Sequence, residues 1–152
     1  AIVDAPSSKI RRGRAAAANF VPTTTGAAVA TTQVLPQLQG KFDGVAVRAP
    51  IPCGSISDMV FLLEKDTTVE EINAVLTEEA ESEKYQGIFG VTNEPLVSSD
   101  IVGITYGSLA DLEMTRVVDG NLVKIMAWYD NEMSFTSQMI REGVRVAEQR
   151  GF

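Results

Sequence analysis

The sequence predicts an α+β fold, in which helices pack on one face of a largely antiparallel or mixed β-sheet. Several short stretches alternate apolar and polar residues at period two, and an Asp-Gly pair joins two of them. Apolar residues with helical spacing are confined to a few segments between and after these stretches. Strands joined by hairpin turns favour antiparallel pairing, and helices with one apolar side need a sheet to cover.

The chain begins with a basic arm, residues 1–20, and we expect residues 21–152 to hold the sheet and the helices. Within the arm, four of the chain's 13 cations stand close together: Lys9, Arg11, Arg12 and Arg14. The arm lacks interleaved aromatic residues, so it does not resemble a nucleic-acid-binding segment.

A threonine-rich stretch, residues 23–26, leads into small apolar residues that suit a helix packed closely on a sheet. We expect this helix to bend or finish near Pro36 and to stop by Gly40. Residues 43–52 then alternate at period two and predict a strand with Arg48 on the face opposite its valines.

Residues 55–64 predict a second strand, more fully buried because apolar residues nearly fill it. A helix should begin at Thr68, since Thr68 and Glu71 have the spacing of a capping box. The acidic residues of this helix fall opposite its apolar side, and we interpret them as a solvated face.

Short strands are predicted over 87–91 and 95–102. Asp119-Gly120 predicts a two-residue hairpin turn, because these residue types tolerate positive φ angles. Apolar residues spaced by three or four over 135–147 predict an amphipathic C-terminal helix.

The composition excludes several chemistries. The 152 residues include one cysteine and no histidine, which rules out a Cys/His zinc cluster, an internal disulfide and a local imidazole base. No metal site is expected. The formal net charge of -7 argues against general binding to nucleic acids or anionic membranes. No stretch approaches the roughly 20 apolar residues of a membrane span, so we expect a cytoplasmic location.

The threonine stretch has the ingredients of an anion site. Free backbone N–H groups, hydroxyl donors and a helix start favour a phosphate group next to Thr25 and Gly26. An ordinary helix cap explains the same residues. Arg12 and Arg48 would favour the anion site if the fold brings them alongside, whereas Arg48 could equally be solvated or paired with the acidic helix.

Cys53 follows Pro52 and precedes Gly54, and the chain has no histidine to activate it. We therefore interpret it as a structural or incidental thiol rather than a nucleophile. No G-x-G-x-x-G sequence occurs, so the usual dinucleotide-binding turn is absent from this chain.

Several motifs resemble one family in both order and spacing. They are Arg11 to Ala17, Pro22 to Ala28, Leu35 to Lys41, Val97 to Gly103, Gly120 to Lys124 and Trp128 to Glu132. Together they resemble the catalytic domain of glyceraldehyde-3-phosphate dehydrogenase, over nearly the whole chain from about Asp4.

The resemblance implies an aldehyde oxidation in which a cysteine thiolate attacks the aldehyde, NAD accepts hydride and inorganic phosphate cleaves a thioester. It implies that Thr25 and Gly26 bind the attacking phosphate, and that Arg48, assisted by Arg12, binds the substrate phosphate. Asn131 would hold the carboxamide of the nicotinamide ring. NADP is not excluded. Residues 1–20 would cross a subunit interface, which implies a homotetramer.

The family's nucleophile segment, Ser-Cys-Thr-Thr-Asn-Cys, is missing, as are its histidine base and its N-terminal dinucleotide domain. All would lie before Ala1, so we expect a C-terminal fragment with no catalytic residue of its own, inactive when alone. Two alternatives stay open: a fragment of erythrose-4-phosphate dehydrogenase, or a non-catalytic assembly or interaction module.

Overall fold

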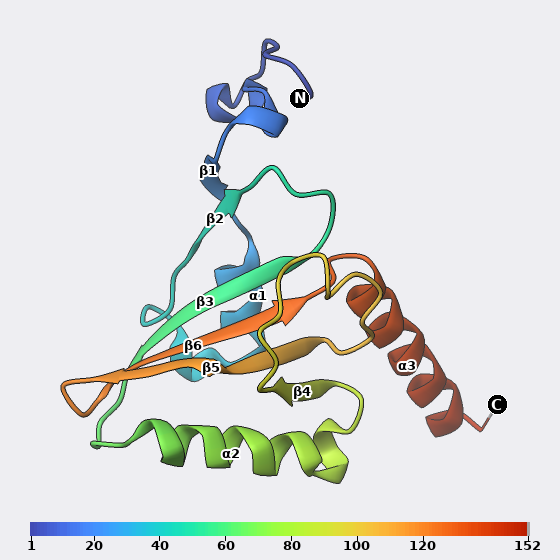
Figure 1. Ribbon diagram of the computed structural model, residues 1–152. Helices are drawn as coiled ribbons and strands as arrows, with labels where there is room; N and C mark the ends of the chain where they lie inside the picture. The colour runs from blue at the N-terminus through green and yellow to red at the C-terminus, as the bar shows by residue number, and fades with distance from the viewer. Residues whose placement is uncertain (152) are drawn as a thin grey trace. The chain divides into compact units, whose positions relative to one another are not determined.

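The computed structural model describes residues 1–151, and the chain forms two compact units, Ala1–Pro52 and the part from Cys53 onward. Figure 1 shows the order of the elements along the chain.

The first unit contains a small antiparallel sheet formed by β1 (Val21–Thr24) and β2 (Val45–Arg48). Its register places Val21 opposite Arg48. Val21 and Ala28, the latter on helix α1 (Ala27–Val34), are buried. Single turns of 3₁₀ helix complete the unit: η1 (Ile10–Gly13), η2 (Ala16–Ala18) and η3 (Pro36–Leu38).

The predicted helix after the threonine stretch is confirmed, and α1 ends at Val34, before Pro36 starts a 3₁₀ turn. Gly40 follows with φ of 75°, a left-handed conformation that glycine adopts without strain. The predicted strand 43–52 is present but shorter, because β2 ends at Arg48, ahead of Pro50. A proline has no N–H to donate to a ladder.

The second unit contains a sheet with the strand order β3-β6-β5-β4. Its pairs are antiparallel except for β4 and β5, which are parallel. The strands are β3 (Ser55–Leu62), β4 (Phe89–Thr92), β5 (Ser108–Val118) and β6 (Leu122–Tyr129). The helical segments are α2 (Val69–Glu81), η4 (Glu83–Tyr85) and α3 (Met133–Gln149), and α2 packs against β4 and β5 (Figure 1). The predicted α+β class with a mixed sheet is confirmed.

The predicted Asp-Gly hairpin is present, but its turn has three residues, 119–121, instead of two. Asp119 and Gly120 have φ angles of 53° and 77°, and Val118 pairs with Leu122 across the turn. The capping box is confirmed too: Thr68 Oγ1 accepts from the Glu71 N–H at 3.2 Å, and the Glu71 carboxylate accepts from the Thr68 N–H, also at 3.2 Å.

Two expectations about strands are wrong. The stretch 95–102 forms turns, because the Asp100 carboxylate accepts from the Val97 N–H at 2.8 Å and thereby competes with a ladder. Strand β3 is present but not fully buried: it lies at the edge of the sheet opposite β4, away from the strands on which α2 packs, and Leu62 is 76% exposed. The core of this unit centres instead on Ile101, Val123 and Ala110.

The predicted C-terminal helix is confirmed as α3, but its apolar side chains face solvent, with Phe135 70% exposed. The helix is held by polar groups instead. Gln138 Nε2 donates to the Thr105 carbonyl at 2.8 Å, and Arg141 donates to the Gly87 carbonyl at 3.1 Å. Within residues 1–151, no helix combines the length and apolar character needed to cross a bilayer.

Candidate functional site

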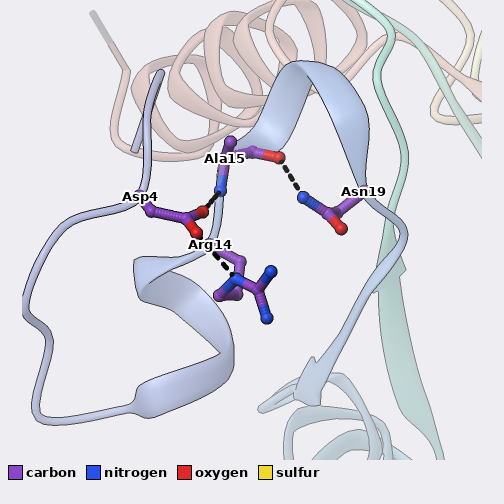
Figure 2. A network of polar contacts seen from close by, with 4 residues as sticks. All are labelled: Asp4, Arg14, Ala15 and Asn19. Carbon is purple, nitrogen blue, oxygen red and sulfur yellow. Dashed lines mark hydrogen bonds and ion pairs between the residues drawn. The ribbon is translucent and has the colours of Figure 1, made fainter.

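The arm is folded into a closed loop by Asp4 (Figure 2). One carboxylate oxygen of Asp4 accepts from the Ala15 N–H at 2.7 Å, and the other accepts from Arg14 Nε at 3.1 Å. Asn19 Nδ2 then donates to the Ala15 carbonyl at 2.8 Å. The Ala15 N–H, together with the Arg14 guanidinium, lowers the pKa of Asp4. The loop fixes the stretch of backbone that carries Arg12.

Arg12 connects the arm to strand β1. Its Nε donates to Thr23 Oγ1 at 2.7 Å, and a terminal nitrogen donates to the Thr24 carbonyl at 3.3 Å. Two bonds to one short segment orient the planar guanidinium. Arg12 therefore lies beside the residues that lead directly into Thr25.

Arg12 and Arg48 line the same cavity, of about 190 Å³. Arg48 reaches it from β2, where it pairs with Val21, and Arg14 lines it as well. The remaining lining comes from Ala1, Ala16 and Val21. Three arginines thus lie around one small, largely apolar hollow, and their combined positive charge favours an anion at this place.

A larger hollow of about 470 Å³ lies against the arm, next to Pro6 and Ile10. Arg14 lines it together with Asp4, so its local charge is balanced. It is therefore less suited to an anion than the arginine cavity.

Thr25 and Gly26 stand at the start of α1. Thr25 Oγ1 accepts from the Ala27 N–H at 3.1 Å, which is a local turn contact and not a helix cap, because the N-cap residue is Gly26 and has no side chain to cap with. The hydroxyl hydrogen of Thr25 remains able to donate. Gly26 is exposed, and a Cβ there would meet no atom of the described chain within 4 Å. An anion can approach this helix start closely, one residue beyond the segment that Arg12 contacts.

Asn131 belongs to the second unit, at the end of β6. The preceding residue, Asp130, is 3% exposed and accepts from the backbone N–H groups of Gly103, Glu132 and Met133 at 2.7 to 2.9 Å. These bonds lower the pKa of Asp130 to about 2. Asn131 Oδ1 accepts from the Gly54 N–H at 3.1 Å.

The free amide nitrogen of Asn131 fits a carboxamide ligand. Asn131 is exposed, and within residues 1–151 its Nδ2 donates to no acceptor. A planar side-chain amide with an unused N–H pair can donate to the carbonyl oxygen of a ligand.

Cys53 lies next to this group, with its Sγ 3.5 Å from Asp130 Oδ1. Burial, and then the hydrogen bond and negative charge of Asp130, raise the pKa of the Cys53 thiol. A thiol kept protonated is a poor nucleophile, in line with a structural role. Among the described residues no group of three or more His, Cys, Asp or Glu side chains forms a possible metal site.

Three residues of the site were not predicted as such. Arg14 lines the cavity, and the cluster of cations in the arm was the signal for it. Thr23 and Gly54 orient Arg12 and Asn131 respectively, through contacts 11 and 77 residues apart in the chain, for which the sequence offers no local signal.

The chain matches the family model "Glyceraldehyde 3-phosphate dehydrogenase, C-terminal domain" over residues 1–131. It is 53% identical over 144 residues to the glyceraldehyde-3-phosphate dehydrogenase of Clostridium acetobutylicum, covering 91% of this chain and 42% of that protein. It is 48% identical over 139 residues to the protein of that name from Haloarcula vallismortis, covering 91% of this chain and 41% of that protein.

A third relative, the glyceraldehyde-3-phosphate dehydrogenase of Streptococcus pyogenes serotype M1, is 50% identical over 145 residues, which cover 92% of this chain and 42% of that protein. The chain thus spans about two fifths of the length of these curated relatives. On the family match and on these identities, the chain belongs to the glyceraldehyde-3-phosphate dehydrogenase family and corresponds to its C-terminal domain.

Proposed function

We propose that this chain serves as the C-terminal catalytic-domain part of an NAD-dependent enzyme that oxidises glyceraldehyde 3-phosphate to 1,3-bisphosphoglycerate with inorganic phosphate. Residues 1–20 act as an inter-subunit arm, and residues 21–152 supply ligand contacts. The observation that carries the proposal is the cavity shared by Arg12 and Arg48, next to the start of α1.

In this proposal Arg48 and Arg12 bind the phosphate of the aldehyde. Both side chains are exposed on a chain with a net charge of -7, so the cavity gathers positive charge where the molecule as a whole repels anions. Guanidinium groups bind phosphate oxygens in pairs, which also orients the aldehyde end of the substrate.

Thr25 and Gly26 bind the inorganic phosphate. The Thr25 hydroxyl donates, and the open helix start lets the anion reach backbone N–H groups. Because these residues follow directly on the segment that Arg12 contacts, the two phosphates bind as neighbours within the first unit.

Asn131 donates from Nδ2 to the carboxamide of the nicotinamide ring and so orients the ring. Hydride acceptance is the chemistry that NAD, or NADP, supplies when bound. The residues of this chain contribute by binding and orienting the substrate and the nicotinamide ring.

The chain alone is proposed to be inactive. It has no histidine, and the thiol of its one cysteine is held protonated by burial and by Asp130. Nothing in it matches an activated nucleophile next to a base. The isolated chain should show no NAD reduction with glyceraldehyde 3-phosphate.

A chimera tests the proposal: this chain replaces the matched segment of the Clostridium acetobutylicum protein. We expect NAD-dependent, phosphate-dependent oxidation of glyceraldehyde 3-phosphate. Arg48→Ala should raise the KM for the aldehyde at least about tenfold, and Thr25→Val should raise the KM for inorganic phosphate about tenfold, since a hydrogen bond to a charged group contributes about 1.5 kcal/mol or more. Arg11→Ala, which removes a charge from the arm outside the cavity, should change neither.

The other outcomes separate the alternatives. A chimera that turns over erythrose 4-phosphate faster than glyceraldehyde 3-phosphate would identify the related dehydrogenase. A chimera that assembles normally but oxidises neither aldehyde, while the parent protein does, would favour a non-catalytic module.

The homotetramer and the cytoplasmic location stay predictions. Light scattering on the chimera and on its Asp4→Ala variant tests the first, because Asp4 closes the arm proposed to cross the subunit interface. A tetramer that dissociates more readily in the Asp4→Ala variant would support the proposed interface.

A further inference from the structure

We infer that Gly54 is a positioning residue, which sets the amide of Asn131 so that its nitrogen, and not its oxygen, is presented to the nicotinamide carboxamide. The inference rests on the proposed function, since it assumes that Asn131 contacts this ring. It adds which atom makes the contact and which residue decides it.

The Gly54 N–H determines the amide orientation. It donates to Asn131 Oδ1 at 3.1 Å, and the Cys53 thiol also faces this oxygen, with Sγ at 3.7 Å. A flip of the amide would turn its NH₂ group against the Gly54 N–H and leave this buried N–H without an acceptor. The nitrogen is therefore left as the outward group.

The backbone of Asn131 is held independently. Asp130, directly before it, accepts from the N–H groups of Glu132 and Met133, directly after it, and the Asp130 N–H donates to Ser134 Oγ at 3.0 Å. The buried carboxylate thus encloses Asn131 in a tight turn. The side chain of Asn131 can still rotate about its own bonds, and the hydrogen bond from the Gly54 N–H fixes its orientation.

The position of Gly54 requires glycine. Its φ is +89°, and a Cβ there would lie 2.8 Å from the Ser98 carbonyl oxygen and 3.6 Å from the fully buried Ile101. Any other residue would strain the loop or displace it. A displaced loop would move the N–H that holds Asn131.

The consequence is a preference for one half of the carboxamide. An amide nitrogen donates, so it recognises the carbonyl oxygen of nicotinamide and gains nothing from the NH₂ group. The 3-acetylpyridine analogue of NAD keeps that carbonyl and replaces the NH₂ with a methyl group. It should therefore keep the contact with Asn131.

Binding of NAD and of the analogue to the chimera tests this inference. Asn131→Ala should raise the Kd of both cofactors by the same factor, about three- to tenfold for one lost hydrogen bond. If Asn131→Ala lowered the affinity for NAD alone, Oδ1 would be the atom that binds the carboxamide NH₂. This result would overturn the inference while leaving the nicotinamide contact in place. No loss on either cofactor would overturn the contact itself, and with it this part of the proposed function.

Gly54→Ala separates positioning from a general structural role. It should release the amide to flip, so the analogue should lose more affinity than NAD and the ratio of the two Kd values should change about threefold or more. An unchanged ratio, with both affinities lowered equally, would mean that Gly54 serves only the fold of the loop.

The hydrogen bond between Gly54 and Asn131 can also be tested by NMR on the chain without cofactor. The Gly54 amide proton should shift downfield in Asn131→Asp, because a carboxylate oxygen replaces the amide oxygen as acceptor, and should lose exchange protection in Asn131→Ala. Asn121→Ala, at an asparagine on the hairpin that donates to the Leu63 carbonyl, is the matched control and should leave Gly54 unchanged. A Gly54 proton that responds to neither Asn131 variant would overturn the inference.

Discussion

Arg12 Nε lies 2.7 Å from Thr23 Oγ1, a contact that ties the basic arm to the strand leading into α1. Since Thr23 is on β1 and Arg48 is on its partner β2, one small sheet positions both arginines of the cavity. The position of Arg12 therefore depends on strand β1 as well as on the arm.

This contact predicts that Thr23 affects phosphate binding without touching phosphate. Thr23→Val removes the acceptor of Arg12 and should raise the dissociation constant of glyceraldehyde 3-phosphate, whose phosphate Arg12 is proposed to bind, by about threefold, the effect of an exposed hydrogen bond of about 0.5 to 1 kcal/mol. Amide chemical shifts of the chain, followed during a titration with glyceraldehyde 3-phosphate, measure it. Thr24→Val is the matched control, because Arg12 contacts only the backbone carbonyl of Thr24. Equal effects of the two variants would contradict the prediction.

Asp130 should make the chain sensitive to acid. Its pKa is about 2 in the fold against an ordinary value of 3.8, so between these values the unfolded chain binds more protons. The stability that Asp130 contributes is complete above about pH 4 and is lost as the pH falls toward 2. Urea midpoints measured from pH 7 to pH 2 should fall less steeply below pH 4 in Asp130→Asn than in the parent chain.

Glu142→Gln serves as the control for that measurement. Glu142 also has a lowered pKa, caused by Arg145 three residues on, but the pair is more than half exposed. Exposed pairs contribute little to stability. If this variant flattened the acid profile as much as Asp130→Asn does, the assignment to Asp130 would fail.

The capping box should be measurable as stability of α2. Thr68→Ala removes the acceptor of the Glu71 N–H and should lower the free energy of unfolding by about 1 kcal/mol. Thr68→Ser keeps the hydroxyl and should cost much less. Urea unfolding followed by circular dichroism compares the three chains; equal losses in both variants would assign the effect to the threonine methyl group instead.

The hairpin turn predicts a cost for a side chain at Gly120. Its φ of +77° disfavours other residues, and a Cβ would lie 3.0 Å from the Asp66 carboxylate carbon. Gly120→Ala should therefore lower stability by about 1 to 2 kcal/mol. Asp119→Asn should be nearly neutral, since asparagine tolerates the left-handed conformation that Asp119 already adopts. Thermal unfolding of both variants tests the difference.

The features predicted correctly from the sequence are those whose causes are close together in the chain. Thr68 and Glu71 are three residues apart and form the capping box expected, and Asp119 and Gly120 are adjacent and form a hairpin turn that is one residue longer than expected. The helix after the threonine stretch is equally local. Such motifs depend on neighbouring backbone and hardly on the rest of the fold.

The features that the sequence did not predict depend on distant segments. The exposure of β3 follows from its place at the edge of the sheet away from α2, which its own residues do not reveal. Gly54 and Asn131 meet across 77 residues, and Arg14 lines the cavity only because the arm folds back on Asp4. The motifs of the family single out Arg12, Arg48 and Asn131, but they do not reveal the neighbours that orient these side chains.

Helix α3 is attached to its unit through hydrogen bonds of Ser134, Gln138 and Arg141, while Phe135 and its apolar neighbours remain in solvent. Hydrogen bonds of this kind contribute about 1 kcal/mol each, far less than a buried apolar helix face would. In the isolated chain α3 should therefore detach and refold many times before the strands β5 and β6 separate, so its amide protons should exchange with deuterium well ahead of theirs.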